Sequence, residues 1–452
     1  MSHATSAPAR DETLLPGRPR LVLFAAGDFA FNLYWQSVML YLLFYYTDTL
    51  GIGVGLAATT YLVASLWDGI AGLIVGILVD RHATSRTYRR LLLFGAPLLG
   101  AAFVLAYWPP AWPGRAGVAA LFACHLLFRT AYALVNVPYL AMSSRVSMAS
   151  SDRAFIAGLR MLAGTAAAVV VALGTVPIGT WLTGSAKGAF LGAALLFAGV
   201  GTVILLIVGA TYREAVPPRS GDPVPLRTAF RALLANRAFV SLAAAMMAMI
   251  AATTALNKSV LYYFKYFVGD EAAGQLALAA MMAVSGAAIP LWMLLARRTG
   301  VRRLWFIATG LCIALLLMFA VGDIHRAGAM QLFLIALQVG IVGLNFALWA
   351  MLPDAVDAGE RATGVRVEAA LFGMVALLQR VSIGLATGLL GLSFARAGYA
   401  ANMAQSPATL AGMRAAIVIL PLAFFIASAL LMRACPLGRS ELETPPRPID
   451  LR

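Results

Sequence analysis

The feature that most constrains this chain is a series of apolar runs, each about 20 residues or longer, separated by short loops that contain arginine. A helix needs about 20 apolar residues to cross a hydrocarbon layer of about 30 Å. Only 12% of the residues are charged and 61% are hydrophobic, whereas a soluble domain carries about 25% charged residues. Because so little polar surface is available, the bilayer must be the solvent of this chain.

We predict an all-α integral membrane protein with twelve transmembrane helices in two six-helix bundles. The N-terminal bundle covers residues 21–211, with helices at about 21–46, 52–79, 91–109, 116–142, 155–180 and 189–211. The C-terminal bundle covers residues 239–432, with helices at about 239–267, 273–296, 304–322, 329–352, 367–397 and 409–432. A central loop, 212–238, joins them, and its prolines favour an extended connection. Residues 1–20 and 433–452 form the terminal segments.

The distribution of basic residues predicts the orientation. Every even-numbered loop is basic, whereas the opposite loops hold only Arg115, Lys187, Arg326 and Arg396. Positive loops mark the cytoplasmic side, so we expect both termini in the cytoplasm and the chain in the inner membrane of a bacterial-type cell. The same pattern accounts for the net charge of +15 without nucleic acid, which would need a basic face in water. Residues 1–20 lack an apolar core, so we expect no cleavable signal peptide there.

The basic loop at residues 80–90 has a counterpart at residues 297–303 in the second half of the chain. Two six-span halves with basic loops in matching places are typical of an internally repeated transporter. The four histidines show no metal-ligand or catalytic spacing, so the sequence predicts neither an enzyme nor a resident metal or cofactor.

Ionisable groups inside apolar spans are costly and need a reason. Asp28, Asn32 and Gln36 recur every four residues, which places them on one face of the first span. They form either one wall of a solute cavity or a polar seam between helices. Asp68, near the middle of the second span, must pair with a cation, bind an ion or carry a proton. The alternative for Asp68 is a permanent structural ion pair.

Span 4 presents Arg129, Tyr132 and Asn136 on one face. Other polar or aromatic residues in the spans are candidates to bind solute, although an aromatic residue in a span is more often a packing residue or an interfacial anchor. With the residues of span 1, the candidate solute-binding set is Asp28, Asn32, Gln36, Arg129, Tyr132, Arg160, Lys258, Tyr263 and Trp349.

A series of motifs runs in order along the chain: GDFAFNLY at 27–34, FYYTD at 44–48, LWDGI at 66–70, NVPY at 136–139, LYYF at 261–264, PDAVD at 353–357 and GVRVE at 364–368. Together they resemble the glycoside–pentoside–hexuronide:cation symporters, the melibiose-permease branch of the major facilitator superfamily. The resemblance covers residues from about 21 to 432. It implies a central cavity and alternating access driven by a co-transported cation.

The resemblance also assigns roles to individual positions. The family places two acidic residues one turn apart on span 2 at the cation site, and here they fall at Asp68 and Gly72. The acid of span 4 falls at Asn136, the sugar-binding acid of span 1 at Asn32, and the lysine of span 11 at Arg380. We therefore expect Asp68, Arg380 and Asn136 to serve cation or proton coupling. The candidate gating residues are Asp80, Arg81 and Arg366, although arginines in these loops could serve topology alone.

Gly72, Asn136 and Asn32 stand where the family has carboxylates, and sodium prefers several hard oxygen ligands, so a sodium site is weakened. The same differences favour a proton as the coupling ion. The proton would reach Asp68 when the pairing of Asp68 with Arg380 or Lys258 is broken. The excess of positive groups suggests an anionic solute such as a uronic acid. The predicted function is secondary active transport of a small solute, sugar-, glycoside- or uronic-acid-like, by proton- or cation-coupled symport. The expected partners are that solute, the coupling H+ or Na+ and membrane lipid, with one chain as a complete unit. The alternatives are an uncoupled transporter, an exporter or a lipid flippase of the same fold, or a receptor or scaffold that has lost transport.

Overall fold

Apolar runs of this length form helices because every backbone N–H and C=O in hydrocarbon must be paired within the segment or with a neighbour. A computed structural model describes residues 18–82, 85–110, 112, 114–143, 146, 150–212, 226–322, 324, 326–364 and 367–437. Across these residues every regular element is a helix. The predicted all-α class is therefore confirmed.

The N-terminal bundle contains the first six spans. Its elements are α1 (Arg18–Ser37), which continues through the π-helical turns η2 (Val38–Leu42) and η3 (Tyr45–Thr49), then α2 (Val54–His82), α3 (Ser85–Ala106), α4 (Gly114–Ser143), α5 (Ser150–Thr183) and α6 (Ala189–Thr211). Within the bundle, α1 packs on α5 and α6, α3 on α4 and α6, and α2 on α4.

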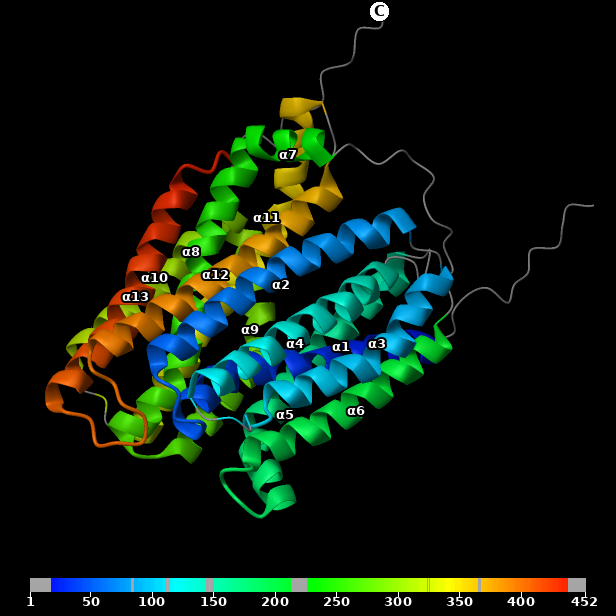
Figure 1. Cartoon of the computed structure of the whole chain (residues 1–452). Coiled ribbons are helices and arrows are strands. Elements are labelled where there is room, and N and C mark those ends of the chain that lie inside the picture. Colours follow the sequence, from blue (N-terminus) through cyan, green and yellow to red (C-terminus); the bar gives the residue numbers. More distant parts are fainter. Residues whose placement is uncertain are drawn as a thin grey trace, which may run out of the picture.

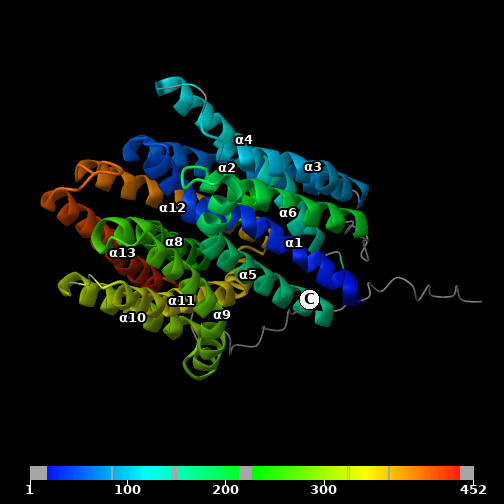
Figure 2. The same cartoon turned by 90° about the horizontal axis from the view of Figure 1, so that it is seen from below.

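The C-terminal bundle repeats this plan. Its elements are α8 (Arg237–Tyr263), which continues as η4 (Phe264–Val268), then α9 (Glu271–Thr299), α10 (Val301–Val321), α11 (Ala327–Thr363), α12 (Glu368–Arg396) and α13 (Pro407–Arg433). Here α8 packs on α12 and α13, and α11 packs on α9 and α10. Figure 2 shows the two bundles side by side, with α12 next to α2.

Among the described residues, eleven helices are long and apolar enough to cross a membrane. The stretch formed by α1, η2 and η3 is not one of them, because Asp28, Asn32 and Gln36 interrupt its apolar residues. It nevertheless packs along α5 and α6 inside the bundle. With this stretch included, each of the twelve predicted spans corresponds to one helical stretch of the structure.

The bundles meet through two matching helix pairs, α2 with α12 and α5 with α9. Among the glycines of α2 and α12, the tightest contact between the two helices is at Gly391, where an added Cβ would lie 2.0 Å from Cβ of Ala58. Contact continues as far as Gly69, which faces Leu377. Beyond it, nothing from a neighbouring element lies within 4 Å of a Cβ built on Gly72 or Gly373. The pair is therefore tight at the end opposite the predicted cytoplasmic side, whereas the two glycines nearer that side meet open space. At that side the ends of α2 and α11 lie apart (Figure 1).

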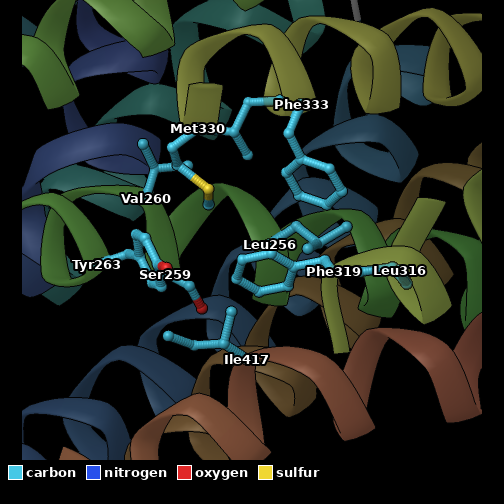
Figure 3. A pocket seen from close by; sticks show the side chains of 10 residues that line it. Leu256, Ser259, Val260, Tyr263, Leu316, Phe319, Met330, Phe333 and Ile417 are labelled. Atoms are coloured by element: carbon cyan, nitrogen blue, oxygen red, sulfur yellow. The ribbon is translucent and has the colours of Figure 1, made fainter. Parts of the chain in front are cut away.

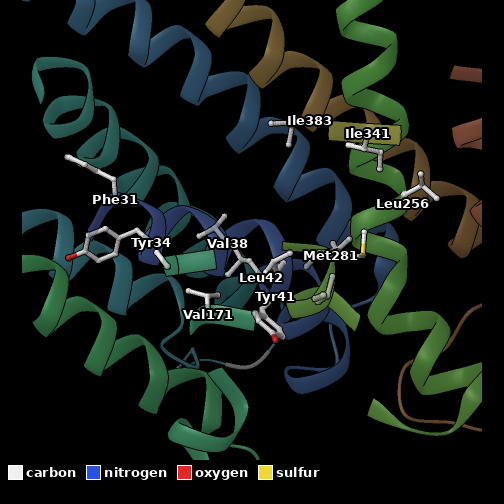
Figure 4. Packing of buried hydrophobic residues seen from close by; sticks show 14 of the residues in the cluster. Phe31, Tyr34, Val38, Tyr41, Leu42, Val171, Leu256, Met281, Ile341 and Ile383 are labelled. Carbon is white, nitrogen blue, oxygen red and sulfur yellow. The ribbon is translucent and has the colours of Figure 1, made fainter. Parts of the chain in front are cut away.

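The core holds apolar side chains from both bundles. Val38 and Leu42 of η2 gather near Met281 of α9 where the bundles meet (Figure 4). Buried tyrosines link helices within the N-terminal bundle. Tyr41 donates a hydrogen bond to the carbonyl of Ala172 at 2.6 Å, and such bonds are retained in apolar surroundings because no water competes for the donor.

The central loop differs from the prediction. Leu226–Ala235 forms a helix, α7, which packs on α8, α11 and α12. The prediction of an extended connection is wrong for these residues. Its prolines lie between 217 and 225, whereas 226–235 contains no proline and repeats apolar residues at helical spacing.

Candidate functional site

The centre of the site is a single carboxylate held by two arginines. Arg129 of α4 donates through Nη1 to Oδ2 of Asp68 at 3.4 Å. Arg380 of α12 forms an ion pair with the same oxygen, with its Nε at 3.2 Å. The Asp68 side chain is only 3% exposed and that of Arg129 only 1% exposed, whereas Arg380 is 24% exposed. Asp68 and Arg129 belong to one bundle and Arg380 to the other, so the second contact crosses between bundles.

Aromatic rings form the walls of this centre. The guanidinium of Arg380 lies 3.7 Å from the ring centre of Trp35, and that of Arg129 lies 5.2 Å from the same ring. Arg129 also faces Tyr61 at 5.4 Å. These cation–π contacts replace part of the hydration that the guanidinium groups lose on burial. They also hold both guanidinium groups over the ring of Trp35.

Two further basic side chains adjoin this centre. Lys258 lies 3.9 Å from the ring centre of Tyr61 and donates to the carbonyl of Met39 at 2.9 Å. His125 accepts a hydrogen bond through Nε2 from Nε of Arg129 at 3.2 Å. A histidine that accepts from a guanidinium is neutral, so His125 adds no charge. We call Asp68, Arg129, Lys258 and Arg380 the central cluster.

The central cluster contains unused hydrogen-bond donors. Within the described residues, Nη2 of Arg129 and Nη1 of Arg380 are buried and have no hydrogen-bond partner. Buried donors of this kind are costly unless a ligand or water satisfies them. An anion is the ligand that two guanidinium groups bind best.

A second cluster forms around Asp28. Its carboxylate pairs with the guanidinium of Arg160 and accepts a hydrogen bond from the hydroxyl of Tyr139 at 2.9 Å. Asn32 donates to the backbone carbonyl of Asp28 at 2.9 Å, and Gln36 donates to Oδ1 of Asn32 at 3.4 Å. The polar face predicted for the first span is thus present, and it faces α4 and α5.

Tyr132 lies between the two clusters. Its ring centre is 5.7 Å from that of Trp35 and 5.8 Å from that of Phe31. The guanidinium of Arg380 lies 6.0 Å from the ring of Tyr132. Across the two clusters, two carboxylates face four cations, which leaves two positive charges without a counter-charge from these residues.

Three other predicted site residues lie apart from these contacts. Tyr263 donates to the carbonyl of Ile324 at 2.7 Å and stacks on Phe267 inside the C-terminal bundle. Trp349 is 53% exposed. Asn136 is half-buried on α4, and in the described part of the chain its side chain makes no hydrogen bond to Asp68 or Arg380.

The gating prediction lies largely outside what the structure describes. Asp80 and Arg81 fall in the last turn of α2, but their side chains are not among the described ones. Arg366 lies outside the described residues altogether. Their gating role stays a prediction.

Sequence reasoning did not select Tyr61, His125 or Tyr139 as site residues. Two of them carried a usable signal. His125 lies four residues before Arg129, and Tyr61 lies seven residues before Asp68, so each shares a helix face with a residue that the sequence had marked for the site. Tyr139 belongs to the motif at residues 136–139 but was not given a role.

A further set of contacts joins the bundles at the end opposite the predicted cytoplasmic side. The carboxylate of Asp48 accepts hydrogen bonds from Tyr266 at 2.6 Å and Tyr399 at 2.8 Å, and it pairs with Lys265 at 2.9 Å. We call these four residues the outer latch. Burial, together with the charge of Asp48, raises the pKa of Tyr399 far above its ordinary value, so its hydroxyl stays a donor.

A pocket also lies inside the C-terminal bundle (Figure 3). Its lining is mostly aliphatic and aromatic, and it contains no charged side chain. The hydroxyls of Ser259 and Tyr263 in its wall are already used, because each donates to a backbone carbonyl. This pocket therefore lacks the groups that would select a polar solute, and the two clusters remain the candidate site.

The structure has two six-helix bundles that share a repeated plan and enclose buried charged groups. The bundles are joined at one end by the outer latch and diverge at the other. These features define a membrane transporter of the major facilitator fold. A bacterial homolog of the human lysosomal transporter Spinster, in an inward-facing and unoccupied conformation, has the same fold: the TM-score is 0.67 over 93% of this chain and 98% of that chain, at 16% identity.

The particular family follows from the sequence comparisons. The model of the MFS/sugar transport protein family matches residues 23–439, and the chain belongs to that family. It is 28% identical to the isoprimeverose transporter of Lactiplantibacillus pentosus, over 90% of this chain and 86% of the relative. It is 26% identical to the glucuronide carrier protein homolog of Escherichia coli strain K12, over 92% of each. The predicted resemblance to sugar:cation symporters is confirmed, and the family to which the chain belongs is a family of transporters.

Proposed function

We propose that this chain carries a small solute with an acidic group, such as a uronic acid or another carboxylated solute, by alternating access and in symport with a proton. The observation that carries the proposal is the charge of the two clusters. Four buried or half-buried cations face only two carboxylates. Uncompensated charge inside a membrane protein is costly, so an anionic solute would complete the site.

The unused donors support the same conclusion. Nη1 of Arg380 and Nη2 of Arg129 lack hydrogen-bond partners that an acidic group could supply on binding, and the rings of Trp35 and Tyr132 lie beside them. Aromatic faces of this kind suit the apolar face of a sugar ring. The name of one relative, the glucuronide carrier protein homolog, refers to a sugar derivative with a carboxylate.

The geometry also supports a coupling step at Asp68. An acidic group that draws Arg380 toward itself would remove one of the two cations that keep Asp68 ionised. Loss of a neighbouring positive charge favours the protonated carboxyl. Solute binding and proton binding would then favour each other, as symport requires.

The proposed setting is the inner membrane, with both termini in the cytoplasm and one chain as a complete unit. The outer latch then lies on the side away from the cytoplasm, and the described conformation faces inward. The arginine-rich loops support this orientation.

The test is a solute-driven pH change in proteoliposomes, with matched panels of neutral sugars, uronic acids and small carboxylates. One acidic solute should make the outside medium more alkaline, and its neutral analogue should not. Asp68→Asn should abolish the signal. Asp270 is an exposed acid at the start of α9, so Asp270→Asn should leave the signal unchanged. An equal response to a neutral analogue, or a full response in Asp68→Asn, would contradict the proposal.

A further inference from the structure

Asp68 already has two cations of the chain itself on one oxygen. Nη1 of Arg129 and Nε of Arg380 lie 3.4 Å and 3.2 Å from Oδ2. Asp68 and Arg129 are almost completely buried. The most direct approach to this carboxylate is therefore occupied by fixed positive charge, in a place that excludes solvent.

A metal ion would meet an unsuitable set of donors here. Na+ and Li+ are hard cations that need several oxygen ligands, with carboxylates supplying the charge. The groups around Asp68 are the guanidinium nitrogens of Arg129 and Arg380, and the rings of Trp35 and Tyr61 lie behind them. Within the described residues, no three His, Cys, Asp or Glu side chains gather as a metal site. The residues present do not fit an alkali metal ion.

The two arginines differ in how firmly they are held. Arg129 lies on α4, which packs on α2 in the same bundle as Asp68, and its Nε is fixed by His125. Arg380 lies on α12 in the other bundle and is 24% exposed. When the bundles rock against each other as rigid bodies, Arg380 can leave Asp68, whereas Arg129 moves with it.

We infer that Arg129 determines the ion specificity of this transporter: its guanidinium stands where a metal ion would have to bind against Asp68, and it makes the carrier independent of Na+ and Li+. The inference rests on the proposed function, because a coupling ion matters only in a working transporter. A proton needs one lone pair and no coordination shell, so it can still reach the carboxylate when Arg380 leaves.

The first test needs no solute. Thermal unfolding of the purified full chain is measured in NaCl, LiCl and KCl at equal ionic strength. The wild type should have the same Tm in all three salts. A saturable rise in Tm that is specific to Na+ or Li+ would overturn the inference, whatever the variants do.

The second test replaces the fixed cation. Arg129→Ala leaves a space of guanidinium size beside a buried carboxylate, so guanidinium at low millimolar concentration should raise its Tm in a saturable way. Urea has the same shape without the charge and should have no such effect. Equal responses to guanidinium and urea, or no response to either, would show that Arg129 only fills space or acts elsewhere.

Two further variants complete the design. Arg129→Lys keeps the charge, so its Tm should remain independent of Na+ and Li+ even if Arg129→Ala fails to fold; a Na+- or Li+-specific shift in this variant contradicts the inference. Arg115→Ala, at an exposed position on the same helix, should show no response to guanidinium beyond that of the wild type. If these results hold and no acidic solute is transported, the proposed function alone fails.

Discussion

The outer latch gives a prediction whose size can be worked out from the structure. Asp48 belongs to the N-terminal bundle, whereas Lys265, Tyr266 and Tyr399 belong to the C-terminal bundle. The side chain of Asp48 is 1% exposed and that of Lys265 is 17% exposed. The change Asp48→Asn keeps the shape of the side chain and removes the charge on which all three partners converge.

A hydrogen bond to a charged group contributes about 1.5–3 kcal/mol. The amide oxygen of Asn can still accept one hydroxyl, but it cannot replace the ion pair with Lys265 or accept at both former oxygens. We therefore expect the outward-closed state to lose about 2–4 kcal/mol relative to the outward-open state. Since about 1.4 kcal/mol is a factor of ten, the equilibrium should shift by about 30-fold or more toward opening.

The assay is the distance between spin labels at Ala186 and Ala404, which lie in exposed loops of the two bundles at the end opposite the predicted cytoplasmic side. The labels are introduced after the three free cysteines are replaced. Asp48→Asn should populate longer distances than the wild type. Asp270→Asn is the control, because Asp270 caps α9 at the same end of the molecule and asparagine caps a helix equally well. Identical distance distributions in Asp48→Asn and the wild type would refute the reasoning.

Three other predictions follow from single contacts. Arg380→Gln should reduce binding of an acidic solute by 100-fold or more, because breaking a buried charge pair costs about 3–5 kcal/mol. The measurement is solute binding to the purified protein. The control variant Arg396→Gln, at the exposed end of α12, should bind the solute normally. Gly391→Ala should lower the Tm through about 1–3 kcal/mol of overpacking, whereas Gly373→Ala, which meets open space, should not. Tyr41→Phe should cost about 1 kcal/mol in an unfolding assay, since it removes one buried hydrogen bond, and an unchanged stability would show that this bond contributes nothing.

The sequence by itself determined the class of protein, the two bundles and the position of each span. Apolar length and loop charge are properties of short stretches of chain, so they can be read without knowing which helices touch. Helical spacing also placed Asp28, Asn32 and Gln36 on one face, and the structure shows hydrogen bonds that link all three. The helix α7 was missed because the neighbouring prolines dominated the interpretation of the central loop.

Only the tertiary structure decided which cation faces which carboxylate. The sequence placed Arg129 among solute-binding residues and expected Arg380 or Lys258 beside Asp68, whereas in the structure Arg129 and Arg380 share its Oδ2. It likewise did not connect Arg160 with Asp28 or Asp48 with Lys265. The spacing of residues along a helix fixes only the face on which a side chain lies. The partner on that face depends on how helices from distant parts of the chain pack together.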